Sequence, residues 1–151
     1  MITIKNSQRS IPVNISHLRT AVERMLEHVG YADFDLGILL TTNATIRRYN
    51  KQFRHKDKAT DILSFPFYPE LKAGKRIKAQ TPEEKSLGDL IISVAYAKKN
   101  IPQDLNLEEY LIYLCAHGIA HVLGYDHETD AEYDRMQKFE KKLRSGVKIK
   151  K

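Results

Sequence analysis

One segment constrains this chain more than any other: residues 111–124, LIYLCAHGIAHVLG, are apolar on nearly every side of a helix and yet contain two histidines. A helix that is apolar all round is buried. His117 and His121 are four residues apart, so on a helix they lie about 40° apart around the axis and about 6 Å apart along it. Gly124 stands where such a helix should end, because glycine adopts the left-handed conformation without a Cβ penalty.

A third histidine follows this predicted helix end. If the chain doubles back after Gly124, His127 approaches His117 and His121. Three converging imidazoles suit a tetrahedral zinc site with one open position, which is the catalytic pattern. The alternative is a chance alignment of core or surface histidines. The apolar helix disfavours it, because an unpartnered buried polar group costs a few kcal/mol and a metal would satisfy both rings.

Composition indicates one folded domain over residues 1–151, with 42% hydrophobic and 29% charged residues. No apolar run is long enough to span a membrane, and the N-terminal residues lack the apolar core of a secretory signal. The single cysteine, Cys115, points away from His117, and we expect a buried apolar side chain there. One cysteine cannot form an intrachain disulfide, so we expect a reducing compartment, the cytoplasm, or an organelle if a presequence was removed.

The net charge of +6 favours polyanionic partners without establishing them. The excess is concentrated at the C-terminus, where residues 141–151 contain six basic and no acidic side chains. We expect a mobile basic tail from about residue 145. Such a tail indicates either attraction to nucleic acid or solubility.

Hydrophobic periodicity predicts an α/β (α+β) domain with a mixed sheet of about four strands packed by helices. Strands are expected at residues 1–6, 34–42, 61–67 and 87–93, and helices at residues 16–29, 42–53 and 94–100. The histidine helix should begin after Asn106 with a capping box completed by Glu109. The last helix should begin at Thr129 with a capping box completed by Glu132. Residues 68–86 are polar and basic and indicate a long surface loop. The side chains expected to face inward on the helices include Phe53, Tyr133, Met136, Phe139 and Leu143.

The histidine spacing matches the metzincin protease pattern with one change, Gly118 in place of the glutamate that follows the first histidine. That glutamate is the general base of those proteases. Metal-assisted hydrolysis stays available to this chain, but proteolysis by the ordinary mechanism lacks its base.

A second group of charged residues lies in NKQFRHKDKATDILSFPF, residues 50–67. Arg54 could grip a phosphate through two parallel hydrogen bonds and stabilise charge on a phosphoryl oxygen. Lys56 and Lys58 are more simply read as a solvated loop. Asp126 could orient a ligand histidine, accept a proton, or only shape a turn. The weaker candidates are Asp61 and Asp89, which suit turns at strand ends, and His17, His28 and His55, which we expect at the surface.

HGIAHVLGYDH, together with NKQFRHKDKATDILSFPF and LGDLIIS, resembles the YbeY family of metal-dependent endoribonucleases over roughly residues 1–144. The resemblance implies that His117, His121 and His127 bind one zinc ion and that Arg54 takes part in RNA cleavage. It also implies single-stranded RNA as substrate, maturation of the 3′ end of small-subunit ribosomal RNA, contact with the small ribosomal subunit, and ribosome quality control.

Two other functions stay open from the sequence. One is a zinc-dependent hydrolase of another substrate, such as a peptidase that takes its base from elsewhere in the fold. The other is a metal-stabilised RNA-binding factor for ribosome assembly.

Overall fold

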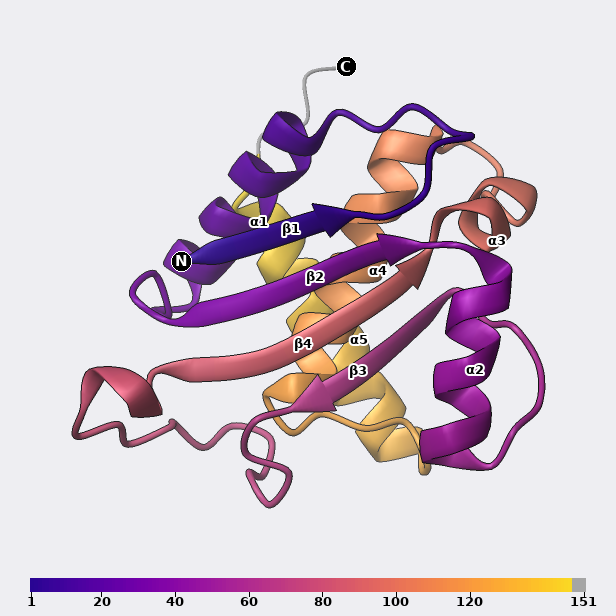
Figure 1. The fold of residues 1–151 in the computed structure, drawn as a ribbon. Helices are drawn as coiled ribbons and strands as arrows, with labels where there is room; N and C mark the ends of the chain where they lie inside the picture. Colours follow the sequence, from indigo (N-terminus) through magenta and orange to yellow (C-terminus); the bar gives the residue numbers. More distant parts are fainter. Residues whose placement is uncertain (148–151) are drawn as a thin grey trace.

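The computed structural model describes residues 1–147 and contains the strands and helices that the sequence predicts, with bounds that differ by a residue or so (Figure 1). In chain order the elements are β1 (Ile2–Asn6), α1 (Ile15–His28), β2 (Asp35–Thr41), α2 (Asn43–Arg54), β3 (Ile62–Pro66), the 3₁₀ turn η1 (Pro82–Glu84), β4 (Ser86–Ser93), α3 (Val94–Lys99), α4 (Leu107–Val122) and α5 (Asp130–Ser145).

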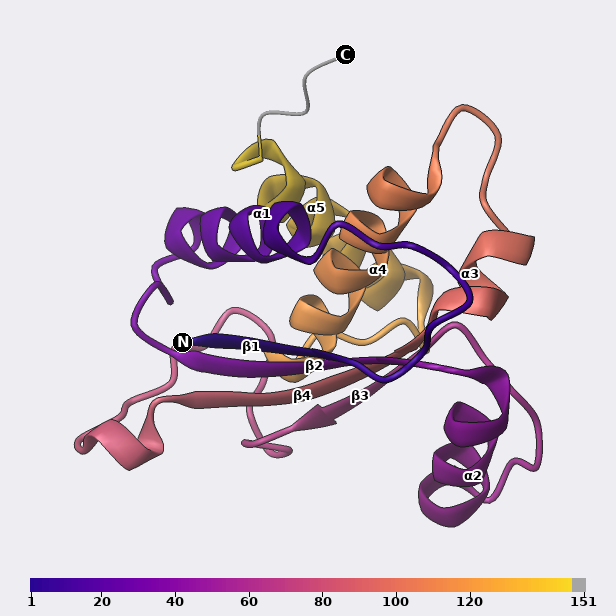
Figure 2. The same cartoon turned by 45° about the horizontal axis from the view of Figure 1, so that its top comes forward.

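The four strands form one mixed sheet in the order β1-β2-β4-β3. β1, β2 and β4 are parallel, whereas β3 pairs antiparallel with β4 and forms an edge. Helices α1, α4 and α5 lie on one face of the sheet and α2 lies on the other (Figure 2). The central strands β2 and β4 are largely apolar, because one face is covered by α1 and α4 and part of the other by α2. The predicted α/β class with a four-stranded mixed sheet is confirmed.

Helix α4 is the centre of the main core, and its start is well defined. Asn106 accepts a hydrogen bond from the Glu109 backbone N–H (2.9 Å) and Glu109 accepts one from the Asn106 N–H (3.2 Å), so the predicted capping box is present. Most of the helix is buried against the sheet, α1 and α5. Cys115 is fully buried, as predicted, and burial raises the pKa of its thiol to about 12, so it is an inert core side chain.

Two aromatic side chains that we predicted to face inward are half exposed, Phe53 at 53% and Tyr133 at 55%. Both lie in a terminal turn of an amphipathic helix, where fewer neighbouring elements cover the apolar stripe. The cap of α5 is also only partly as predicted. Thr129 accepts a hydrogen bond from the Glu132 N–H (3.1 Å). Within residues 1–147 the Glu132 side chain makes no reciprocal hydrogen bond to the Thr129 N–H.

Residues 68–86 cover the core more than a solvated loop would. Leu71, Ile77 and Ala79 pack against the main cluster. The Arg76 guanidinium donates to the backbone oxygen of Gly30 (2.6 Å) and lies 4.4 Å from the centroid of the Tyr31 ring. This segment therefore closes one end of the sheet–helix interface.

The basic segment 141–151 begins within the last helix, ahead of the tail predicted from about residue 145. Lys141, Lys142 and Arg144 belong to α5, and the Arg144 guanidinium lies 4.2 Å from the centroid of the Tyr113 ring. The remaining basic residues of the tail, from Lys148 on, lie outside the described residues. Within residues 1–147, no helix combines the length and apolarity needed to cross a membrane.

Candidate metal centre

The turn after α4 brings the third histidine back toward the other two. Gly124 adopts φ +95°. The helix end is closed by hydrogen bonds from the Gly124 N–H to the His121 oxygen (3.0 Å) and from the Tyr125 N–H to the Ala120 oxygen (3.0 Å). A Cβ on Gly124 would lie 2.4 Å from the backbone oxygen of Leu71, so the 68–86 segment presses on this corner as well. Glycine is required here for both reasons.

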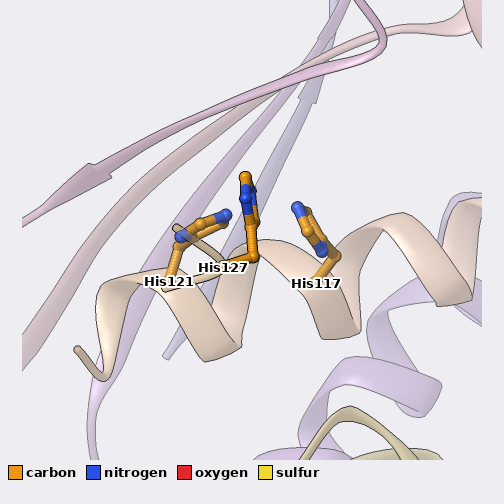
Figure 3. Close-up of side chains that lie close together, drawn as sticks. All are labelled: His117, His121 and His127. Carbon is orange, nitrogen blue, oxygen red and sulfur yellow. The ribbon is translucent and has the colours of Figure 1, made fainter. Parts of the chain in front are cut away.

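The three imidazoles then form one cluster (Figure 3). One nitrogen of each of His117, His121 and His127 lies within 4.8 Å of the other two. A tetrahedral zinc ion with Zn–N bonds of about 2.0–2.1 Å places ligand nitrogens roughly 3.4 Å apart, so small side-chain rotations would close the site. His117 and His121 are half-buried and His127 is exposed, which leaves one side of the cluster facing solvent. The donor set and its open side fit a zinc ion with a free position.

The electrostatics of the cluster favour a neutral imidazole at His121. The pKa of His121 is lowered from 6.5 to about 4, first by burial and then by the neighbouring His117 and His127 rings, against a smaller opposing effect of Asp126. His121 is therefore unprotonated at neutral pH, and its lone pair is available to a metal.

Glu140 is the site residue that the sequence reasoning missed. Its side chain projects from α5, and one carboxylate oxygen lies 3.3 Å from His117 Nδ1. Glu140 is only 7% exposed, and its second oxygen, Oε2, is buried without a hydrogen-bond partner among the described residues. A carboxylate only accepts hydrogen bonds, so this contact requires the proton on Nδ1 and leaves Nε2 of His117 free. The sequence signal was a glutamate on the otherwise apolar stripe of the last helix, between Met136 and Leu143.

Asp126 hydrogen-bonds to the backbone, and within residues 1–147 no hydrogen bond joins it to a histidine ring. Its carboxylate accepts a hydrogen bond from the His127 backbone N–H (2.8 Å) and so shapes the turn that presents His127. Asp61 likewise accepts from the Ile62 N–H (2.7 Å) at the start of β3. These contacts are turn chemistry, which was the simpler alternative for each.

The glycine that replaces the metzincin glutamate has a packing role. A Cβ on Gly118 would lie 2.7 Å from Leu90 Cδ2 and 2.9 Å from Ile62 Cδ1. Helix α4 therefore lies so close to β3 and β4 that a larger residue at this position would require the Leu90 and Ile62 side chains to shift. A glutamate at this position would be directed into the sheet.

Arg54 is the last residue of α2 and is exposed. Helix α2 packs on the sheet face opposite α4 (Figure 2), and within residues 1–147 Arg54 makes no hydrogen bond or ion pair with the histidines. Its role stays a prediction. The other histidines, His17, His28 and His55, are exposed as expected.

Comparisons with known proteins show the family of the chain. The family model described as "Endoribonuclease YbeY" matches residues 3–148. A human protein of that name is 35% identical over 93% of this chain and 84% of its own length. A protein of the same name from Persephonella marina is 42% identical over 74% of this chain and 68% of its own length. One from Geobacter metallireducens is 35% identical over 94% of this chain and 92% of its own length.

The fold has a solved counterpart. A Thermotoga maritima protein determined in solution superposes with a TM-score of 0.57 at 22% identity, covering 96% of this chain and 90% of that one. At this identity the likeness concerns the fold alone. The family match extends over nearly the whole chain and supports an endoribonuclease role, and we conclude that this chain belongs to the YbeY endoribonuclease family.

Proposed function

We propose that this protein is a zinc-dependent endoribonuclease that cleaves single-stranded RNA during maturation of the 3′ end of small-subunit ribosomal RNA and in ribosome quality control. The observation that carries the proposal is the cluster of His117, His121 and His127, whose nitrogens lie within 4.8 Å of one another beside an open side. Three neutral nitrogen ligands and one free position are the arrangement of catalytic zinc sites. The family name supports RNA as the substrate, the ribosomal RNA is what the sequence resemblance implies, and the single buried cysteine suits the cytoplasm.

The chain's residues would divide the work as follows. His117, His121 and His127 hold the ion, and Glu140 keeps His117 in the orientation and tautomer that present Nε2. When bound, zinc supplies a Lewis acid that polarises a phosphoryl oxygen and lowers the pKa of water toward neutrality. Arg54 would stabilise the negative charge that develops on the phosphorus oxygens, a role for which its exposed guanidinium is free.

A peptidase is a poorer fit to this geometry. Gly118 occupies the place of the metzincin base and is pressed against Leu90. Glu140 is buried and contacts the Nδ1 side of His117, so it orients the ring and does not face the open side.

The test is cleavage of a defined fragment that spans the 3′ end of small-subunit ribosomal RNA, with the metal content of each variant measured. We expect His117→Ala to lose both zinc and cleavage, and Arg54→Ala to lose cleavage while it keeps zinc. His17→Ala and Arg24→Ala, exposed residues of α1, are matched controls that should behave as wild type. Unchanged cleavage by His117→Ala would refute the proposal. Casein turnover that stops on chelation would favour the peptidase instead.

A further inference from the structure

Helix α2 and the turn that follows it carry an excess of positive charge. Residues 43–58 include six cations, Arg47, Arg48, Lys51, Arg54, Lys56 and Lys58, all exposed, and one carboxylate, Asp57. Asp57 pairs with Arg47 at 2.8 Å, and this bond lowers the pKa of Asp57. The other five cations have no carboxylate partner within residues 1–147. A surface with this imbalance attracts polyanions.

An exposed aromatic side chain lies among these charges. Phe53 stacks on Tyr49 with ring centroids 6.1 Å apart and an interplanar angle of 13°, and it meets the Phe65 ring edge-on at 5.3 Å. It is nevertheless 53% exposed. The three rings line a cavity of about 440 Å³ on the sheet face that α2 covers only in part. A ring held in place by two others, with its remaining surface in water, is ready to stack on a planar ligand.

The cationic turn is also held in a defined shape. The Asn50 side chain is buried and its amide donates to the backbone oxygen of Lys58 (2.9 Å), and the Lys56 N–H donates to the backbone oxygen of Asn50 (3.2 Å). His55 adopts φ 59°, which reverses the chain. These bonds mean that Lys56 and Lys58 are presented by an ordered turn, unlike the solvated loop that their sequence suggests.

We infer that α2 and its following turn bind the backbone of single-stranded RNA outside the metal centre, with one base stacked on Phe53. Fixed cations beside an aromatic face are the two elements of single-strand recognition, since phosphates supply the charge and every base has a π-face. The cavity's own charges, Lys5 and Asp89, offset each other, so the attraction comes from α2. The inference rests on the proposed function for the choice of RNA as the polyanion.

The position of this surface connects it to the metal centre. Arg54 ends α2, the preceding Phe53 meets Phe65 of the edge strand β3, and α4 contacts β3 on the opposite face. A strand bound along α2 would pass Arg54 and turn around that edge toward the histidines. The surface would therefore hold RNA that flanks the cleaved bond.

The test is fluorescence anisotropy of a labelled oligo-uridine with methylated 2′ hydroxyls, titrated with the full-length protein over a series of salt concentrations. Phe53→Leu should weaken binding about five- to hundred-fold with the salt dependence unchanged, whereas Phe53→Tyr should bind as wild type. Lys51→Gln and Lys56→Gln should each weaken binding and reduce the slope of log K against log salt by about 0.7. Lys138→Gln, an exposed lysine of α5 on the other side of the sheet, should change neither quantity.

Equal affinity of wild type, Phe53→Leu and Lys51→Gln for the RNA would overturn the inference. It would favour a protein partner for the surface of α2. The outcome is separable from that of the nuclease proposal. If His117→Ala abolishes cleavage while the α2 variants bind normally, only the surface is wrong. If the wild type does not cleave RNA but Phe53→Leu loses affinity for it, the RNA-binding surface is supported and the nuclease proposal is refuted.

Discussion

The contact between Glu140 and His117 allows a test in which metal affinity and fold stability should change in different directions. Glu140 is 7% exposed, and its Oε2 atom has no partner within residues 1–147. A buried carboxylate with one oxygen lacking a hydrogen-bond partner destabilises the metal-free protein. Its removal should therefore not lower the stability of the metal-free protein. Glu140→Leu keeps a similar volume and eliminates this charge. We expect the free energy of unfolding of metal-free Glu140→Leu to be no lower than that of wild type, because the unpartnered buried oxygen is removed.

Zinc affinity should change in the other direction. Without the acceptor, the His117 ring is no longer held in the Nδ1–H tautomer, and loss of such an orienting carboxylate lowers metal affinity about 10- to 100-fold, or about 1.4–2.7 kcal/mol. Glu140→Gln is the matched variant, because its amide oxygen can still accept from Nδ1. Its affinity should lie between those of wild type and Glu140→Leu.

Two measurements decide the matter: urea unfolding in the presence of chelator, and zinc titration in competition with a chromophoric chelator. Wild-type zinc affinity in Glu140→Leu would show that the carboxylate does not position His117. A loss of about 2 kcal/mol or more in the metal-free unfolding experiment would show that Glu140 instead stabilises the α4–α5 packing.

Three further predictions follow from packing, capping and protonation. Gly118→Ala should lower the free energy of unfolding by about 1–2 kcal/mol, because overpacking against Leu90 outweighs the helix-propensity gain of alanine. If urea unfolding showed the variant to be more stable than wild type, the close approach of α4 to the sheet would be contradicted. Asn106→Ala should cost about 1 kcal/mol by the same measurement, since it removes the cap of α4, and an unchanged midpoint would argue against that cap. His121 has a folded pKa of about 4 and an unfolded one near 6.5, so the unfolded chain takes up the proton first as pH falls. The contribution of His121 to the free energy of unfolding of the metal-free protein should therefore be fully present above pH 6.5 and decline toward pH 4. His121→Gln should remove part of that decline in unfolding curves recorded across this range. An unaltered pH profile would refute the assignment.

Much of the fold was predictable from local sequence signals. The two apolar runs at β2 and β4, the periodicity of α1 and α2, and the Asn106 cap each act over a few residues, so their chemistry is visible without knowledge of the tertiary structure. The same holds for the histidine cluster. His117 and His121 share a helix face by spacing alone, and Gly124 marks the reversal that returns His127.

What the sequence could not determine depends on contacts between segments that are far apart in the chain. Glu140 meets His117 only because α5 packs on α4, and no local pattern connects residues 23 positions apart. Gly118 was recognisable as a missing glutamate, but its necessity comes from Leu90 on a neighbouring strand. Likewise, the exposure of Phe53 depends on how much of the sheet face α2 covers. Helix periodicity defines which side of a helix is apolar, but the tertiary packing decides how much of that side is covered and which charges lie beside it.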